Sequence, residues 1–385
     1  MAPWRRLWSV LVGVSGLLGG LFLAAPPRAA DAAGPFTGVV QADAGDYFTC
    51  ALRGDGTVWC WGDNENGALG DGTTDSRTLP VQVVNLTGVI QLSSGSAHSC
   101  ALRSDHTVWC WGDNVYGKLG DGTTTDRSLP VRVKHLTGVV QVEAGGLNTC
   151  AVRSNGTAWC WGFGETGALG DGQSIDRALP VRVKNLTDVV HIAATGYSTC
   201  ASLANGAVRC WGANGEGELG DGTTRPRLLP VKVKGLSGPV TRVQAGAFHV
   251  CALRTDGTVW CWGDNREGAI GDGTTVNRLV ATRSLMTHAA GLKLGSFDTC
   301  ARTKTKTVMC WGVNSFGQLG DGSTVDSSNP VAVTGLVDVT SLALGSWHSC
   351  AVLRDGTMRC WGWNASGQLG NGTTQNSSVP IPVLS

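Results

Sequence analysis

The stretch from Cys50 to Gly62 reads CALRGDGTVWCWG, and it decides the fold because it recurs along the whole chain. In each recurrence a cysteine is followed ten residues later by Cys-Trp-Gly, and the first cysteines of successive units lie 49 to 51 residues apart. A period near fifty residues is typical of propellers, whose repeats bury their faces only against one another. Seven pairs account for all 14 cysteines: Cys50 with Cys60, Cys100 with Cys110, Cys150 with Cys160, Cys200 with Cys210, Cys251 with Cys261, Cys300 with Cys310 and Cys350 with Cys360.

Each unit can be divided into four strands, A to D, which in the third unit are residues 139–142, 149–153, 157–161 and 180–183. Strands B and C form a hairpin, since Asp-Gly at the centre of most units is typical of a tight β-turn. Both faces of the B–C hairpin are apolar, so each small sheet must be covered on both sides. The sequence therefore predicts an all-β protein, a seven-bladed β-propeller of four-stranded blades over residues 33–385.

The hairpin also pairs the cysteines. With a turn centred on Asp55, Leu52 opposes Val58 and Cys50 opposes Cys60, and opposed residues of an antiparallel pair lie close enough for a disulfide. Metal ligation is the alternative, but a ten-residue spacing lacks the tight knuckle of a zinc site. We expect one disulfide per blade, each contributing about 2–3 kcal/mol, and no metal or cofactor.

The N-terminus is typical of a targeting segment. Arg5 and Arg6 precede an apolar run from Leu7 to Ala25, and small residues follow at 29–33. Residues 1–32 are predicted to be a signal peptide, with an uncleaved anchor as the alternative. We expect a monomer that is secreted or held in the cell envelope, with no stable membrane span after cleavage. The net charge of +1 does not favour a nucleic-acid partner.

Residues 44–45, 50–59, 61–64 and 67–73 (AG, CALRGDGTVW, WGDN and GALGDGT) resemble the regulator of chromosome condensation repeat family. The resemblance extends from about Thr37 to the C-terminus and implies a seven-bladed propeller. The family's founding member is a nuclear guanine nucleotide exchange factor that acts through a β-wedge, for which the even unit spacing leaves no room. The closer functional analogue within the family is a secreted bacterial-type member that binds enzymes through aromatic residues on one propeller face. Its repeats are shorter and lack this cysteine pattern, so its target does not carry over.

Comparison of the seven units locates a candidate binding face, since framework positions repeat and partner-contacting positions need not. Variable aromatic residues gather in the A–B and C–D loops, which share one end of a propeller. They are predicted to bind an extracellular protein or other ligand without catalysis. The alternative is that some of these rings pack between blades or plug the channel. The candidates are Tyr47, Phe48, Tyr116, Phe163, Tyr197, Phe248, Phe297, Phe316, Trp347 and Trp363.

Two polar features allow other functions. His249, Asp298 and His348 occupy equivalent positions in three successive units, so a secreted lyase or hydrolase with a site there is the alternative to a binding scaffold. In the C–D loops, Asn64 and Asp71 could suggest calcium, but they recur in most units, which favours a role in bracing the loop backbone.

Overall fold

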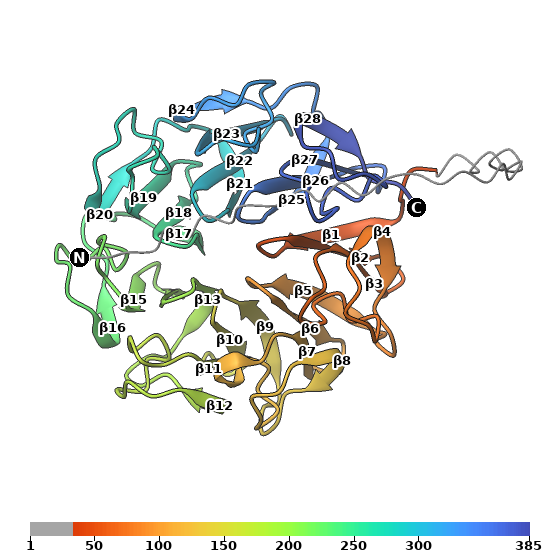
Figure 1. Ribbon diagram of the computed structural model, residues 1–385. Helices are drawn as coiled ribbons and strands as arrows, with labels where there is room; N and C mark the ends of the chain where they lie inside the picture. The colour runs from red at the N-terminus through yellow and green to blue at the C-terminus, as the bar shows by residue number, and fades with distance from the viewer. Residues whose placement is uncertain (1–33) are drawn as a thin grey trace, which may run out of the picture. The chain divides into compact units, whose positions relative to one another are not determined.

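The structure is a computed structural model that describes residues 34–385, so the predicted signal peptide lies outside the described residues. Seven antiparallel sheets of four consecutive strands surround a central axis, and the first strand of each sheet lies innermost (Figure 1). The predicted seven-bladed, all-β propeller is confirmed. A single short helix in the described part of the chain, the 3-10 turn η1 (Val115–Gly117), lies in the C–D loop of the second blade.

The strand bounds repeat almost without change. The inner A strands are β1 (Val39–Ala44), β5 (Val89–Ser94), β9 (Val139–Ala144), β13 (Val189–Ala194), β17 (Val240–Ala245), β21 (Ala289–Leu294) and β25 (Val339–Leu344). The B strands are β2 (Phe48–Arg53), β6 (His98–Arg103), β10 (Asn148–Arg153), β14 (Ser198–Leu203), β18 (His249–Arg254), β22 (Asp298–Thr303) and β26 (His348–Leu353). The C strands are β3 (Val58–Gly62), β7 (Val108–Gly112), β11 (Ala158–Gly162), β15 (Val208–Gly212), β19 (Val259–Gly263), β23 (Val308–Gly312) and β27 (Met358–Gly362). The outer D strands are β4 (Arg77–Gln82), β8 (Arg127–Arg132), β12 (Arg177–Arg182), β16 (Arg227–Lys232), β20 (Arg278–Arg283), β24 (Ser327–Ala332) and β28 (Ser377–Pro382).

The B–C hairpin has the register expected from its turn. Leu52 opposes Val58 and Cys50 opposes Cys60, and Gly56 takes a positive φ of 79° in the turn.

All seven predicted disulfides are present, with Cα–Cα distances of 4.0 to 4.1 Å. Every cysteine is paired within the hairpin of its own blade, so the bridges brace blades without linking them. The bridges join Cys50 to Cys60, Cys100 to Cys110, Cys150 to Cys160, Cys200 to Cys210, Cys251 to Cys261, Cys300 to Cys310 and Cys350 to Cys360.

The C–D loop is held by its own polar side chains. The side-chain amide of Asn64 donates to the carbonyls of Thr73 and Asp75, and its oxygen accepts from the backbone N–H of Leu69. Asp71 accepts from Thr73 and pairs with Arg77 at 3.1 Å. The bracing role predicted for Asn64 and Asp71 is confirmed. The D strands begin earlier than expected, at Arg77 in the first blade, because the loop returns this arginine to pair with the last residue of strand C.

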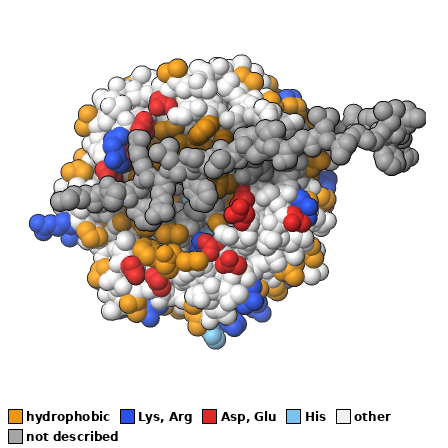
Figure 2. All heavy atoms as spheres, viewed as in Figure 1, with side chains coloured by type: hydrophobic (Ala, Val, Ile, Leu, Met, Phe, Trp, Pro, Cys, Tyr) orange, Lys and Arg blue, Asp and Glu red, His pale blue; other side chains and the backbone are white. Residues whose placement is uncertain are grey.

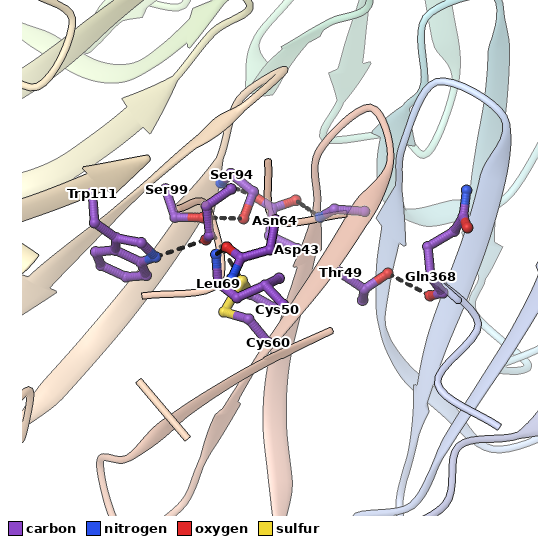
Figure 3. The surroundings of a disulfide bond; sticks show 12 residues. Asp43, Thr49, Cys50, Cys60, Asn64, Leu69, Ser94, Ser99, Trp111 and Gln368 are labelled. Carbon is purple, nitrogen blue, oxygen red and sulfur yellow. Dashed lines mark hydrogen bonds between the residues drawn. A yellow bond between two sulfur atoms is a disulfide. The ribbon is translucent and has the colours of Figure 1, made fainter. Parts of the chain in front are cut away.

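Neighbouring blades pack a disulfide against a tryptophan. Cys50 and Cys60 of the first blade share an apolar cluster with the fully buried Trp111 of the second (Figure 3). The indole N–H of Trp111 donates to the carbonyl of Ala68, 2.8 Å away in the first blade. The same bond recurs from Trp61, Trp161, Trp211, Trp262, Trp311 and Trp361 to the preceding blade. These tryptophans link the blades, because each indole N–H pairs with a carbonyl of the preceding blade. Without that partner, burial of the carbonyl in the interface would be costly.

The ring closes with the same contacts as its other interfaces. Trp61 of the first blade donates to the carbonyl of Gln368 in the seventh, and Val39 N–H donates to the carbonyl of Gly356. Each blade is built from one sequence unit, so no strand is exchanged at closure. Phe36 adds to this interface, because its backbone N–H bonds the carbonyl of Val383 and its ring packs edge-on against Trp61.

Candidate functional site

The A–B and C–D loops lie together at one end of the propeller, as antiparallel strand order requires. The two kinds of loop touch directly, since the backbone N–H of Asp63 donates to the carbonyl of Tyr47 at 2.9 Å. The same bond joins the equivalent residues of the other blades, for example Phe163 to Leu147. A side chain three residues before the first cysteine of a unit is therefore brought beside one that follows Cys-Trp-Gly.

Nine of the ten candidate aromatics form one continuous chain of ring contacts, which we call the aromatic arc. Successive ring centroids lie 5.0 to 6.5 Å apart, which is the range of favourable aromatic pairs. Tyr47 and Tyr197 are each 40% exposed, so the arc reaches the surface. In order of contact its members are Tyr116, Phe163, Tyr197, Phe248, Phe297, Trp347, Phe316, Trp363 and Tyr47.

The tenth candidate, Phe48, lies elsewhere. Its ring is 1% exposed and packs between the first and second blades beside Cys50 and Trp111. This is the position of the buried His98 and Asn148 in the next two blades, so it belongs to the interface between blades. The alternative that some rings pack inside the propeller therefore describes Phe48, and the remaining nine rings form the arc.

The end that carries the arc is acidic. Between the strand bounds given above, the A–B and C–D loops contain 19 Asp and Glu against three Lys and Arg, whereas the loops of the opposite end contain six of each. Five arginines that begin D strands neutralise part of this charge, as Arg77 does for Asp71. Figure 2 shows one face of the propeller, on which hydrophobic side chains gather toward the middle and acidic side chains lie around them.

Acidic groups beside the arc alter the ionisation of their neighbours. Burial raises the pKa of the Tyr47 hydroxyl, and the charge of Asp46 raises it further. Burial likewise raises the pKa of Asp63, with an added contribution from the charge of Glu65. Both effects disfavour further negative charge here, so a cation placed near these carboxylates would be stabilised.

His249, Asp298 and His348 do not meet in an open site. Each is 1% exposed and lies in a different interface between blades. His249 Nε2 lies 2.8 Å from Thr299 Oγ1, and His348 Nε2 lies 2.8 Å from Thr49 Oγ1. Burial lowers the pKa of His249 to about 4 and of His348 to about 3, and it raises the pKa of Asp298 well above its usual value. His249 and His348 are therefore neutral at pH 7, burial disfavours the charged form of Asp298, and the blades close all three off from solvent.

Residues 34–385 contain neither a metal-binding cluster nor a membrane-spanning helix. No group of three or more His, Cys, Asp or Glu there could hold a metal ion. No helix in the same range is long and apolar enough to cross a membrane.

A set of functional candidates in the axial channel was missed from the sequence. Asp43, Glu143, His191, Arg242 and Lys293 line a cavity on the axis. The available signal was the alternation within strand A, where two positions that face the axis vary from one unit to the next.

Together the fold and the site define a disulfide-braced seven-bladed β-propeller whose A–B and C–D loops form an aromatic, acidic end. The chain belongs to the regulator of chromosome condensation (RCC1) repeat family. One profile of this repeat matches residues 55–102, 105–152, 155–202, 205–253, 307–352 and 355–385. A second profile matches residues 39–68, 89–118, 139–167, 189–218, 240–269, 292–318 and 339–368. No curated protein matches the chain.

Solved structures share the fold at low sequence identity. The structure of Kap60 bound to yeast RCC1 (Prp20) has a TM-score of 0.77 at 20% identity, covering 95% of this chain and 91% of that chain. Human WBSCR16 has a TM-score of 0.71 at 24% identity, covering 80% and 84% respectively. The ectodomain of the receptor kinase CR4 from Physcomitrella patens has a TM-score of 0.55 at 21% identity, covering 85% and 74%. At these identities the likeness concerns the fold alone.

Proposed function

We propose that this chain is an exported, non-enzymatic binding scaffold that recognises a basic protein surface through the aromatic arc. The observation that carries the proposal is the continuity of the arc on an acidic end of the molecule. Aromatic rings provide large contact areas at low entropic cost, and they dominate the energetics of many interfaces. The surrounding carboxylates favour a partner that presents Lys or Arg around an apolar segment, and they would speed its association.

Export is part of the proposal. Seven disulfides in one chain are typical of proteins that fold in an oxidising compartment. The predicted signal peptide at residues 1–32 agrees with this, and so does the resemblance to secreted bacterial-type members of the family. The buried state of His249, Asp298 and His348 disfavours the alternative of a lyase or hydrolase acting there.

The proposal can be tested with a variant in which Tyr47, Tyr197, Phe297 and Trp347 are all changed to alanine. Binding is measured to an array of short peptides graded in net charge from acidic to basic, at low and at physiological salt. We expect the native chain to bind basic peptides that contain aromatic or aliphatic residues, and the variant to lose about 100-fold or more in affinity. Binding of the native chain should weaken as salt is raised.

A matched control changes three exposed apolar residues in the D–A loops of the opposite end, Val84, Leu285 and Val337, to threonine. This variant should bind as the native chain does. Both variants should still unfold cooperatively, with a lower unfolding temperature for the four-alanine variant because it loses ring contacts of the arc. Binding that ignores peptide charge, or that survives loss of the four aromatic rings, would refute the proposal.

A further inference from the structure

A cavity of about 820 Å³ lies on the propeller axis, away from the aromatic arc. Its walls are the A strands, and its rim includes Leu102, Leu253 and Arg302, from the ends of B strands that lie farthest from the A–B loops. A volume of this size is typical of sites for small molecules.

Toward the end that carries the arc, the cavity lining stops at Asp43, Glu143, Gln244 and Lys293 and includes no residue of the A–B turns. Successive A–B turns are stacked so closely that a Cβ added at Gly95 would overlap the carbonyl oxygen of Gly145. The backbone N–H of Asp46 donates to the carbonyl of Ser96, and the Ser346 hydroxyl donates to the Asp46 carboxylate. The cavity therefore opens toward the end formed by the B–C and D–A loops.

One position of the A strands lines the cavity all around the axis, and its residue type differs between blades. Gln41, Gln91 and Gln141 each bind both the N–H and the carbonyl of one residue in the next A strand, for example Leu92 for Gln41. In the next two blades His191 and Arg242 stand in place of this glutamine. The Arg242 side chain is exposed in the cavity, and His191 Nδ1 has no partner among the described residues.

A second ring, two residues further along the A strands, carries charge of both signs. Asp43 in the first blade pairs across the cavity with Lys293 in the sixth, at 2.7 Å. Glu143 projects from the third blade, and burial raises its pKa to about 7 although Lys293 lowers it. The acidic groups thus come from the first and third blades and the cations Arg242 and Lys293 from the fifth and sixth.

We propose that this cavity is a second binding site, for a short zwitterionic peptide whose carboxylate contacts Arg242 and whose ammonium contacts Glu143. Because Asp43 and Lys293 pair with each other, Glu143 and Arg242 are the charges left for a ligand, and a ligand ammonium beside Glu143 favours the ionised form of this carboxyl, as Lys293 does. A ligand with one charge of each sign at its two ends meets the opposite charge on both walls. The glutamine amides and Ser341 add polar groups along the wall between them.

The test uses isothermal titration of the full propeller with the dipeptide Ala-Ala and two capped forms of it. N-acetyl-Ala-Ala lacks the ammonium, and Ala-Ala-amide lacks the carboxylate. We expect saturable binding of Ala-Ala, and affinities lower by about ten-fold or more for each capped form, since each loses one charge-assisted contact. Equal binding of all three probes, or no saturable binding of Ala-Ala, would overturn the proposal.

Two variants locate the site. Arg242→Gln installs the residue found at the equivalent position in the first three blades, and Glu143→Gln removes only the charge. Each should lower Ala-Ala affinity by about ten-fold or more while leaving the unfolding temperature near that of the native chain. The control Lys304→Gln alters an exposed cation in a B–C turn at the same end and should change nothing. Unchanged binding in both cavity variants would also overturn the proposal.

Discussion

The position two residues before the first cysteine of each unit shows how single residues are selected in this propeller. It holds Phe48 in one blade, His98 or Asn148 in others, and it is buried in all seven. A glycine three residues earlier makes room for these larger side chains. In the fourth blade Thr195 replaces that glycine, and the buried position holds the small residue Ser198. The carbonyl of Ser198 accepts a hydrogen bond from the Thr195 hydroxyl. The two residues therefore compensate for each other in volume.

Asp298 is the least favourable occupant of this position. Its Oδ2 atom is buried without a partner in the described structure, and burial holds its pKa well above the usual value. Above about pH 4 the unfolded chain therefore releases this proton while the folded protein keeps it. The contribution of Asp298 to the free energy of unfolding is fully present below that pH and is lost as pH rises through the folded pKa. Asp298→Asn, with the residue found at Asn148, should remove this pH dependence.

Chemical denaturation at pH 4 to 8 measures the effect. At pH 7 the Asp298→Asn variant should be more stable by about 1–3 kcal/mol. Asp75→Asn is the control, because the Asp75 side chain is 75% exposed, and it should leave the profile unchanged. If the difference in stability between the Asp298→Asn variant and the native chain did not grow with rising pH, the assigned protonation state would be wrong.

Lys306 carries local backbone strain that can be relieved. It has a positive φ of 65° in the B–C turn of the sixth blade, where the first blade has Gly56. We expect Lys306→Gly to stabilise the protein by about 1 kcal/mol, measured by denaturant titration. His106 has a similar φ of 62°, but its Nδ1 atom lies 2.9 Å from the carbonyl of Val139. His106→Gly should gain less, because it loses this contact, and an equal gain in both variants would argue against the explanation.

At the scale of elements, the B–C hairpin is the unit that every blade repeats. Its disulfide faces the next blade and its second tryptophan faces the previous one, so each interface joins a bridge to an indole ring. The first tryptophan of the hairpin, as in Trp260, is only half-buried and bonds the Thr258 hydroxyl of its own blade at 3.2 Å. The two tryptophans of one hairpin are therefore expected to differ in energetic weight.

Replacement of each tryptophan by phenylalanine tests this difference. Trp262→Phe should cost about 3 kcal/mol, because it leaves a void in a fully buried interface and removes the 2.8 Å bond to the carbonyl of Glu218. Trp260→Phe should cost under about 1 kcal/mol, because water can replace its bond. Equal losses in equilibrium unfolding would mean that the inter-blade bond does not distinguish them.

At the scale of the whole molecule, closure depends on contacts between the two ends of the described chain. The backbone of Phe36 pairs with Val383, and Pro35 forms an isolated bridge with Leu384. The Phe36 ring packs edge-on against Trp59 and Trp61 and is 3% exposed. Among the described residues, neither a disulfide nor a chain segment joins the seventh blade to the first, so packing and hydrogen bonds hold the ring shut.

Phe36→Ala should therefore weaken one interface selectively. We expect a loss of about 3 kcal/mol, with faster amide hydrogen exchange in β1 and β28 than in the central blades. Val337→Ala alters a side chain that is 64% exposed and serves as the control. An increase in exchange spread evenly over all seven blades would indicate that the ring opens as one unit rather than at this interface.

Much of this architecture could be predicted from local pattern. Hairpin register follows from a turn such as Asp55-Gly56 and from alternation along two adjacent strands, so the pairing of Cys50 with Cys60 needed no information from distant residues. The seven-fold repeat then determined the number of blades. The aromatic candidates were also accessible to sequence comparison, because unit-to-unit variation marks the loops where Tyr47 and Tyr197 lie.

Relations between blades could not be obtained in this way, because they depend on the packing angle and closure of the ring. The sequence alone does not show that Phe48 packs in an interface between blades while its neighbour Tyr47 belongs to the aromatic arc. Nor does it show that Lys293 reaches Asp43 across the axis, 250 residues away in the chain. The hairpins are determined by short-range sequence. The aromatic arc and the charged cavity, in contrast, exist only because the closed ring brings separate loops and inner strands of the seven blades together.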